Sequence, residues 1–489
     1  MLPSISGCVE PNPDHCVNNG GDEYCAQQHS DWDNAYCSDN RCVDEITEDG
    51  CQQEVPTGCW YCNGRDEDEC SEVADGDGDG DGDGDGDGDM GDGDGDGDGD
   101  GDGDTGPECM TSDECSGETP LCEDGGCVGC GEAMTASCAG EYPETPACAE
   151  GGACVVCTGE DVTACSGETP ACADNVCVPC DEHDQCPESA CEIELGTCMP
   201  PDRVWFVDGD EPNCDDDGSG TEDTPLCSLL GGLGRIGANE KGTLVLRDMP
   251  GQTYEESLTV QSGRTVAIVG EGLEYPVWSN GVENFALQIN GASLYLSDVE
   301  IESADAYGVE LLQGKAWIQR AKIVNNTGGG VAAAAGTLVI ENSFIGGSLS
   351  DVNAIENNGA DLLLSYSTVV AGAAGFGMPA ALACTDGTTT VRGSVLVSVA
   401  MNDEVACQGA MISGSVLEND AGFPGNTGLQ FEMDWFVDLL KGDFHLDVAP
   451  DGIENAAVWA SGDPRRDIDG EPRQDQEGEA GYAGADVPL

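Results

Sequence analysis

Two basic and two acidic residues in the C-terminal half have a spacing that could support acid–base chemistry. Arg320 and Lys322 lie two residues apart, and Asp298 and Glu300 each precede one of them by 22 residues. Side chains at i and i+2 of a strand point to the same face. An Arg or Lys beside carboxylates can act as a base, and paired carboxylates can act as acid and base. The simpler interpretation is a solvated strand face, where charges also alternate at a period of two.

Acidic residues further upstream could hold a cation. The group Asp208, Asp210, Asp215, Asp216 and Asp217 offers the oxygen ligands that calcium prefers, although a solvated acidic loop has the same composition. An Asp-Gly tract, residues 75–104, contains the D-x-D-x-D-G opening of a calcium loop but lacks its closing Glu and flanking helices. Calcium is therefore a hypothesis for the first group, and weak binding of several ions is the expectation for the tract.

The cysteines define an internal repeat. Of 29 cysteines, 25 fall at or before Cys198, and the octapeptide CSGETPLC at 115–122 recurs as CSGETPAC at 165–172. Sixteen cysteines fit four modules of four, each too small for a core of its own. The modules are Cys109/115/122/127, Cys130/138/148/154, Cys157/165/172/177 and Cys180/186/191/198. Disulfides explain this density, but four cysteines allow three pairings and the sequence does not choose among them.

The same region contains C-x-x-C pairs, which suggest zinc as an alternative. They occur at 127–130, 154–157 and 177–180, and two such pairs can hold a tetrahedral zinc ion. Each pair joins the end of one module to the start of the next, so zinc would leave two cysteines of every module unexplained. We therefore favour disulfides. Thioredoxin-type redox chemistry requires a βαβ context, which this Gly- and Pro-rich region does not have.

The charge balance excludes some partners. Only 15 Lys and Arg face 97 Asp and Glu, a formal net charge of -82. A nucleic-acid binder needs a basic surface, and anionic membranes would repel this chain. No run of about 20 apolar residues predicts a membrane-spanning helix. Cations and neutral or basic polymers remain compatible partners.

The N-terminus offers one membrane anchor. Ile5-Ser-Gly-Cys8 is similar to a bacterial lipobox, in which the cysteine carries lipid. With Cys8 set aside, the other 28 cysteines divide into even groups of 8 (Cys16 to Cys70), 16 (Cys109 to Cys198) and 4. Short motifs of this kind also arise by chance, so lipidation of Cys8 is a hypothesis. We expect residues 1–8 to be the remnant of a signal, 9–74 a Cys-rich region, 75–104 a disordered linker and 105–200 the four repeats.

The strands that would position Asp298, Glu300, Arg320 and Lys322 belong to a β-solenoid. From residue 201 a glycine recurs before each short apolar run at intervals of 21 to 28 residues, for example Gly291, Gly314, Gly336 and Gly359. A second column follows with serines at 343, 367, 394 and 415. Strand, sharp turn, strand and longer connection, repeated about every 22 residues, predict an all-β fold of about eight stacked coils over 201–430.

At these residues the chain resembles a known family. Residues 202–489 are similar to the right-handed parallel β-helix, pectin-lyase-like superfamily. The similarity includes the opening segment DGSGTEDTPLCSL at 217–229 and the closing segments DIDGEPR at 467–473 and AGAD at 483–486. The Cys-rich modules with their Asp-Gly spacer resemble stalks of bacterial surface lipoproteins. The resemblance implies fold and export. Because the open end of a solenoid must be blocked, we expect Asp467, Asp469 and Arg473, within the C-terminal segment 431–489, to form a structural cap on that end.

The sequence predicts two disulfides in this region, the second of them from the coil alignment. Cys214 and Cys227 flank the opening segment and would close it as a loop. Cys384 and Cys407 fall at near-equivalent positions one coil apart, where Cα atoms lie about 5 Å from each other. The second bridge would join adjacent coils, so it tests the alignment.

Two functions remain open. We expect a binding or structural protein, secreted or on a bacterial cell surface, that displays a β-helix to a polysaccharide or a matrix component. The alternative is an exported polysaccharide lyase or glycoside hydrolase, because the superfamily includes such enzymes. The paired Asp and catalytic His of pectin hydrolases are not found, so whether the chain is an enzyme stays undecided.

Overall fold

The computed structural model describes residues 109–131, 137–159, 161–280, 285–347, 351–373, 378–400, 403–474 and 476–488, together with four short strands nearer the N-terminus. The chain divides into two units, Met1–Asp102 and Gly103–Leu489. In the first, β1 (Tyr36–Ser38) pairs antiparallel with β2 (Arg41–Val43), and β3 (Gln52–Glu54) with β4 (Cys59–Tyr61). Cys8 and the Asp-Gly tract lie outside the described residues.

Each Cys-rich module of the second unit is a two-stranded antiparallel hairpin. The pairs are β5 (Leu121–Glu123) with β6 (Gly126–Val128), β7 (Ala147–Cys148) with β8 (Cys154–Val155), β9 (Ala171–Ala173) with β10 (Val176–Val178), and β11 (Cys191–Glu192) with β12 (Thr197–Cys198). Single turns of helix precede three of them: η2 (Ser112–Glu114), α3 (Cys138–Glu141) and η3 (His183–Gln185).

Two disulfides close every module, and they follow one rule. The first cysteine bonds to the third and the second to the fourth: Cys109–Cys122 and Cys115–Cys127, Cys130–Cys148 and Cys138–Cys154, Cys157–Cys172 and Cys165–Cys177, Cys180–Cys191 and Cys186–Cys198. The third and fourth cysteines face each other across the hairpin, so the first two are held on its two strands. All 16 cysteines are paired, which leaves no thiolate in these modules for zinc.

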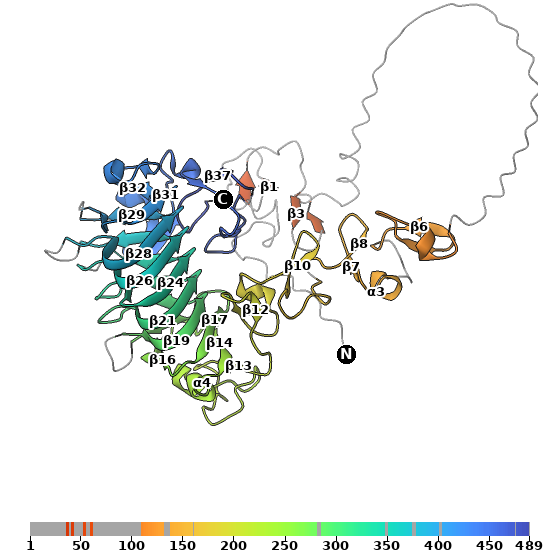
Figure 1. Cartoon of the computed structure of the whole chain (residues 1–489), viewed down its shortest axis with the longest axis horizontal. Helices are drawn as coiled ribbons and strands as arrows, with labels where there is room; N and C mark the ends of the chain where they lie inside the picture. Colours follow the sequence, from red (N-terminus) through yellow and green to blue (C-terminus); the bar gives the residue numbers. More distant parts are fainter. Residues whose placement is uncertain are drawn as a thin grey trace, which may run out of the picture. The chain divides into compact units, whose positions relative to one another are not determined.

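The larger part of the second unit is a right-handed parallel β-helix of about seven turns, close to the eight expected. Its coils stack from β13 beside α4 (Leu229–Arg235) to β32 (Figure 1). One sheet has 12 strands: β13 (Val204–Val207), β14 (Lys241–Arg247), β16 (Leu258–Gln261), β17 (Thr265–Glu271), β19 (Leu287–Ser297), β21 (Val309–Gln319), β23 (Val331–Ala333), β24 (Gly336–Glu341), β26 (Ile355–Ser365), β28 (Leu382–Arg392), β30 (Val405–Ala406) and β31 (Met411–Ser413).

The second sheet has nine strands, most of which follow a strand of the first sheet after a sharp corner. They are β15 (Tyr254–Glu255), β18 (Val277–Ser279), β20 (Glu300–Ile301), β22 (Lys322–Val324), β25 (Phe344–Gly346), β27 (Thr368–Ala371), β29 (Val395–Ser398), β32 (Val416–Leu417) and β33 (Thr427–Gly428). All pairings within both sheets are parallel. The predicted fold class is confirmed.

Equivalent residues of successive coils stack in register to form the core. Leu296, Ile318, Ile340, Leu364 and Val391 are direct neighbours in the first sheet, and all are fully buried. The glycine that opens each run is needed for the same stacking. A Cβ on Gly336, which has a φ of +100°, would lie 2.1 Å from the carbonyl oxygen of Gly314 one coil earlier. Only glycine fits there.

The corner between the sheets combines a left-handed residue with a buried serine. Asp298, Arg320, Asn342 and Tyr366 have φ between +43° and +56°, and Gly393 and Gly414 have left-handed angles at the same position of later coils. From Asn342 onward a serine follows each of these residues, at 343, 367, 394 and 415. The backbone N–H groups of Ser343, Ser367 and Ser394 donate to the serine hydroxyl of the following coil at 3.1 to 3.2 Å. This serine ladder satisfies buried donors, while the left-handed residues form a corner row whose side chains point outward.

The C-terminal segment packs along the outer face of the second sheet. Val324, Phe344, Val370, Val395 and Val397 of that sheet belong to one buried cluster with aromatic and aliphatic side chains of the segment, including Phe431, Trp435, Phe436, Phe444 and Ile468. The segment contains η5 (Met433–Trp435), η6 (Ile453–Asn455) and the hairpins β34 (Phe436–Asp438) with β35 (Asp443–Leu446) and β36 (Ala457–Val458) with β37 (Ala480–Gly481). A short turn, η4 (Asp420–Gly422), precedes it. The sheet's apolar outer face requires this cover.

Two further disulfides lie in the β-helix. Cys214 bonds to Cys227 with a Cα–Cα distance of 4.9 Å, and Cys384 bonds to Cys407 at 4.5 Å. The second bridge joins Cys384 of β28 to Cys407, which directly follows β30 in the next coil, as the coil alignment predicts. Ten disulfides within the described residues are typical of a protein that folds in an oxidising, extracytoplasmic compartment. No helix of the described part of the chain is long and apolar enough to cross a membrane.

Candidate functional site

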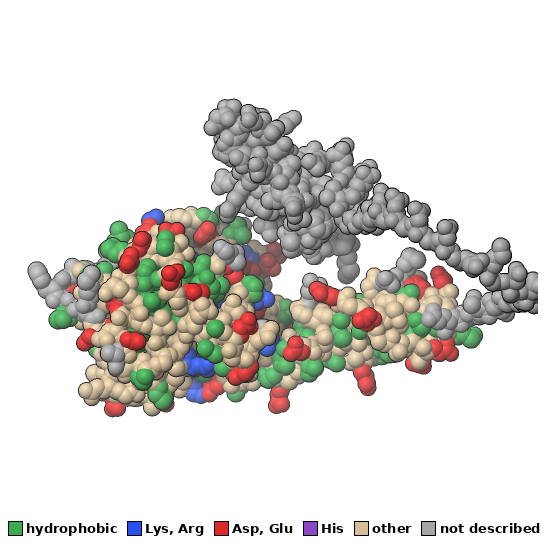
Figure 2. All heavy atoms as spheres, turned by 90° about the horizontal axis from the view of Figure 1, so that it is seen from above, with side chains coloured by type: hydrophobic (Ala, Val, Ile, Leu, Met, Phe, Trp, Pro, Cys, Tyr) green, Lys and Arg blue, Asp and Glu red, His purple; other side chains and the backbone are tan. Residues whose placement is uncertain are grey.

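The fourth Cys-rich module is attached to the first sheet by charge pairs. Lys241 pairs with Glu192 and Lys315 with Glu194, in each case a base of the sheet with an acid of the module. A third pair is also made by a base of the β-helix and an acid of the module: Arg320 Nη1 lies 3.5 Å from Glu182 Oε2. Basic side chains are few beside the acidic ones on the face that Figure 2 shows. In a chain with only 15 Lys and Arg, three of them serving one module is a concentrated use of positive charge.

An apolar contact lies between these charge pairs. Tyr295 and Trp317 stack with ring centroids 4.8 Å apart and planes 21° from parallel. Ala190 and Met199 of the module bury against this pair, and Ala267 completes the cluster. The two rings occupy neighbouring coils of one outward column, since Tyr295 pairs with Trp317 in the sheet register. The module therefore covers aromatic surface that an isolated β-helix would expose to water.

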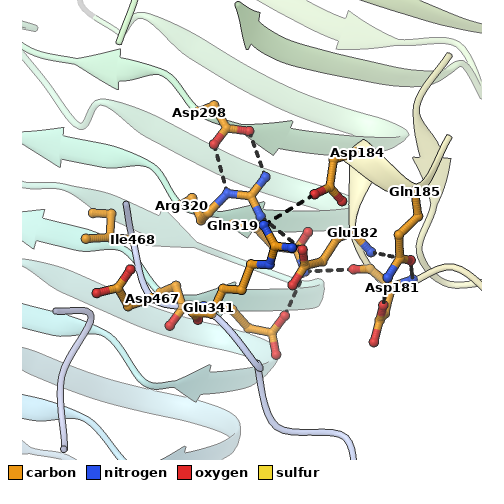
Figure 3. A network of polar contacts seen from close by, with 12 residues as sticks. Asp181, Glu182, Asp184, Gln185, Asp298, Gln319, Arg320, Glu341, Asp467 and Ile468 are labelled. Atoms are coloured by element: carbon orange, nitrogen blue, oxygen red, sulfur yellow. Dashed lines mark hydrogen bonds and ion pairs between the residues drawn. The ribbon is translucent and has the colours of Figure 1, made fainter. Parts of the chain in front are cut away.

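Arg320 is the centre of the polar network at this junction (Figure 3). Its Nε and Nη2 donate to the two carboxylate oxygens of Asp298 at 2.9 and 3.1 Å. Alongside, Gln319 donates to Glu341 at 2.8 Å and to the carbonyl oxygen of Asp181 at 3.2 Å. These largely buried side chains therefore join the corner row and the first sheet to the fourth Cys-rich module.

The electrostatics of the network follow from burial. Burial would lower the pKa of Arg320, but the hydrogen bonds and charge of Asp298 outweigh it and raise that pKa. Burial raises the pKa of Glu182, and Arg320 offsets part of this effect. His183, next in the chain, is 4% exposed, and burial lowers its pKa to about 4. Its Nδ1 accepts the N–H of Cys191 at 3.1 Å, which fits a neutral imidazole.

A cavity of about 320 Å³ opens beside Arg320. Its wall includes Asp184 of the module, Tyr275, Asp298 and Arg320 of the β-helix, and Arg466 and Asp469 of the C-terminal segment. Arg466 Nη1 lies 3.9 Å from Asp184 Oδ2, and the Tyr275 hydroxyl donates to the carbonyl oxygen of Ile468 at 2.8 Å. Charged groups of both signs line a recess of a size that admits a small polar ligand.

The four residues with catalytic spacing lie in two pairs. Asp298 and Arg320 belong to the corner row and face the cavity. Glu300 and Lys322 are register neighbours on the second sheet, and Lys322 Nζ lies 4.7 Å from the Tyr275 ring centroid and 5.7 Å from that of Phe344. Burial raises the pKa of Glu300 to about 7, with Glu302 adding to the effect. A catalytic role for either pair stays a prediction.

The acids proposed for calcium bind backbone groups in the loop that precedes α4. Asp208 Oδ1 accepts from the N–H groups of Asp210 and Glu211, and Asp215 Oδ1 accepts from that of Asp217. Asp216 accepts from Cys227 and Ser228 at the start of α4. Within the described residues, the groups of side chains close enough to share a metal ion are three sets of disulfide-bonded cysteines and the set His445, Asp469 and Asp486. Calcium at the loop stays a prediction.

Sequence reasoning did not find the partners that complete the junction. Glu182 lies 138 residues from Arg320, and Arg466 is a further 146 residues along the chain. Periodicity relates residues one coil apart, such as Asp298 and Arg320, but carries no information on which module docks where. One sequence signal for this docking was present: several acids lie at 181–184, and the predicted strands of the first sheet contain bases that could pair with them.

A family of unknown function (DUF8331) matches residues 96–204, which include the four Cys-rich modules. No curated protein matches the chain. Among solved structures, a crystal structure of pectate lyase Pel9A is 12% identical, with a TM-score of 0.27, and the match covers 58% of this chain and 96% of that one. Similarity at this level assigns no activity.

Proposed function

We propose that this chain is an extracellular binding protein that presents a β-helix head on a disulfide-rich stalk. Its ligand is a polysaccharide or a component of the extracellular matrix, and lipid on Cys8 anchors it to a bacterial cell surface. The ten disulfides of the described residues support export. The acidic composition supports a neutral or basic ligand over nucleic acid or an anionic membrane.

The attachment of the fourth module to the first sheet is the observation that carries this proposal. Three charge pairs and a buried apolar cluster hold the module on the sheet, so the end of the stalk and the head move as one piece. Arg320, the cation best placed for catalysis, is bound to Glu182 of the module and to Asp298 of the preceding coil. An arginine held by two carboxylates in this way is suited to a structural or ligand-binding role and not to acid–base catalysis.

The cavity beside Arg320 is the proposed contact point for the ligand. Its lining of Arg, Asp and Tyr side chains offers both donors and acceptors, as the hydroxyl groups of a sugar require. Arg466 is half-exposed at its mouth and is the group that a ligand would meet first.

A glycan array probed with the full chain, with and without calcium, tests the proposal. We expect binding to a restricted set of glycans, and we expect Arg466→Ala to weaken it. Arg465→Ala is the matched control, because Arg465 is exposed, adjacent and not part of the cavity wall. Equal loss in both variants, or no binding to any glycan or matrix protein, would reject the proposal. Loss of binding without calcium would point to the loop of Asp208 and Asp215.

Catalysis is the second candidate, because Asp298 and Arg320 both line the cavity. Incubation of the chain with uronate and neutral glycans separates the two functions. New reducing ends or unsaturated products that disappear in Arg320→Gln would establish an enzyme. Binding with no product would leave the display function.

The anchor has its own test. Expression of the full-length gene in a bacterial host, followed by mass spectrometry of the N-terminal peptide, should show a lipid on Cys8. A protein that leaves the cell unmodified, and is unaffected by Cys8→Ser, would remove the anchor from the proposal without affecting the binding function.

A further inference from the structure

A second polar cluster lies where β35 meets the last turns of the chain. His445 of β35, Asp469 and Asp486 each offer one ligand atom within 4.8 Å of the other two. Asp486 is 6% exposed, and the His445 side chain is 22% exposed. Imidazole nitrogen and carboxylate oxygen are ligands that zinc and its neighbours among the transition metals accept.

The orientation of the His445 ring is fixed by Asp443. His445 Nδ1–H donates to Asp443 Oδ1, which leaves Nε2 facing Asp469. A carboxylate that fixes a histidine in this way is the usual outer partner of a metal-bound imidazole. Nε2 is buried and lies 2.8 Å from Asp469 Oδ2, yet without the alignment that an N–H···O hydrogen bond needs. An atom placed beside both, rather than a proton between them, would satisfy this geometry.

The two carboxylates are also held by the backbone. Asp486 Oδ2 accepts the N–H of Leu446 at 2.7 Å, which ties it to the strand that carries His445. Asp467 Oδ1 accepts the N–H groups of Asp469 and Glu471, at 3.0 and 2.8 Å, and so fixes the turn on which Asp469 lies. Side chains that converge from three separate segments are therefore positioned before any ligand arrives.

The local charge favours a divalent cation. Asp443, Asp469 and Asp486 contribute three negative charges, and the nearby Asp467 and Glu471 add two more. The opposing bases are Lys322, which acts on His445 and Asp469, and Arg473, which is coupled to Asp486. With a neutral imidazole, negative charge is in excess around the cluster, and a divalent ion would reduce this excess.

We propose that His445, Asp469 and Asp486 form a binding site for a divalent transition-metal ion, with zinc as the representative, and that Asp443 positions the histidine. Tetrahedral zinc places its ligands about 3.3 Å apart. The cluster reaches that spacing if its widest pair, within 4.8 Å, closes by roughly 1.5 Å, and if His445 Nε2 and Asp469 Oδ2, which lie 2.8 Å apart, separate by about 0.5 Å. A fourth position stays open to water. The ion would fasten β35 to the segment 467–486.

The rival occupant is a proton. Burial would lower the pKa of His445, but its interactions with the carboxylates of Asp443 and Asp469 raise it to about 9. Metal and proton then compete for one nitrogen, and a site that binds only the proton is an ion-pair cluster. The experiment below separates the two.

Titration of the full chain with zinc chloride, followed by calorimetry in excess magnesium, tests the proposal. We expect one saturable site per chain. His445→Gln should abolish it, and Asp443→Asn should weaken the zinc affinity by about 10- to 100-fold. Asp434→Asn is the matched control, because it removes the same charge from an exposed position of the same segment. The Asp-Gly tract is present in every variant, so any zinc that it takes up contributes equally to all of them.

No saturable zinc site in the wild-type chain, or equal affinity in His445→Gln, overturns the proposal. If His445→Gln does not fold, X-ray absorption of the zinc-loaded wild-type chain decides instead. One imidazole with oxygen ligands supports the site. Sulfur ligands, or oxygen alone, contradict it.

Discussion

Arg320 and Asp298 occupy the same corner position of successive coils and form a two-point ion pair, Nε to Oδ1 at 2.9 Å and Nη2 to Oδ2 at 3.1 Å. Both residues have left-handed backbone angles, which direct their side chains outward instead of into the core. The pair therefore serves two purposes. It links two coils, and it presents a buried positive charge to Glu182 of the docked module.

Removal of this arginine should loosen the module. Arg320→Ala leaves Asp298 and Glu182 partly buried without a counter-ion, and we expect a loss of about 2 kcal/mol, reduced from the fully buried case because both acids retain some exposure. Hydrogen exchange should rise in β11 and β12 more than in β26. Lys441→Ala, at an exposed position of the C-terminal segment, should change neither. Unchanged exchange in the module of Arg320→Ala would show that Arg320 does not hold it.

Stability should fall in mild acid through His183. Its pKa in the folded state is about 4, below the ordinary 6.5, because burial disfavours the charged form. Between those values the unfolded chain binds more protons than the folded one, so stability is complete above pH 6.5 and declines as the pH drops towards 4. The full difference corresponds to about 3 kcal/mol. Urea unfolding as a function of pH, compared with His183→Gln, measures it. A variant with the same acid dependence as the wild type would contradict this assignment.

The serine ladder should be sensitive to loss of one hydroxyl. Ser394 is fully buried, and its Oγ accepts the N–H of Ser367 at 3.2 Å. Ser394→Ala leaves that donor unsatisfied, which should cost about 1–3 kcal/mol in the free energy of unfolding. Ser461→Ala, at an exposed site, is the comparison. Equal midpoints of chemical denaturation for the two variants would mean that water replaces the hydroxyl.

The bridge between the last coils should protect that end of the β-helix. Replacing Cys384 and Cys407 by Ser together opens a loop with a sequence separation of 23, and we expect a loss of about 3 kcal/mol. The effect should be local, with faster exchange in β30 and β31 and little change in β14. The double variant of Cys214 and Cys227 should show the reverse pattern, because that disulfide lies beside α4. Uniform exchange changes in both would contradict a local role.

The repeat made much of the fold predictable. Residues that recur every coil, such as the glycines before each run and Ser343 to Ser415, report stacking directly, because parallel coils place equivalent residues about 4.8 Å apart. The same logic placed Cys384 beside Cys407 and Asp298 beside Arg320. The pairing inside each Cys-rich module was not predictable, since all three pairings are sterically open to four cysteines until the hairpin brings the third and fourth face to face.

The candidate site was only partly accessible in this way. The coil repeat brought Asp298 to Arg320, but it also grouped Glu300 and Lys322 with them, and the corner separates the two pairs. His445 and Asp469, 24 residues apart in a segment without repeats, gave no spacing that relates one to the other.

The sequence by itself determined the solenoid, its coil register, the disulfide-rich character of the modules and the acidic surface. Each of these follows from a repeat in the sequence or from its amino-acid composition. Three contacts were decided only by the tertiary structure. The fourth module covers Tyr295 and Trp317, Arg320 forms an ion pair with Glu182, and His445 lies close to Asp486. These contacts join segments between 41 and 138 residues apart. No local pattern encodes such distances, because docking depends on the shape and charge of surfaces that exist only after each part has folded.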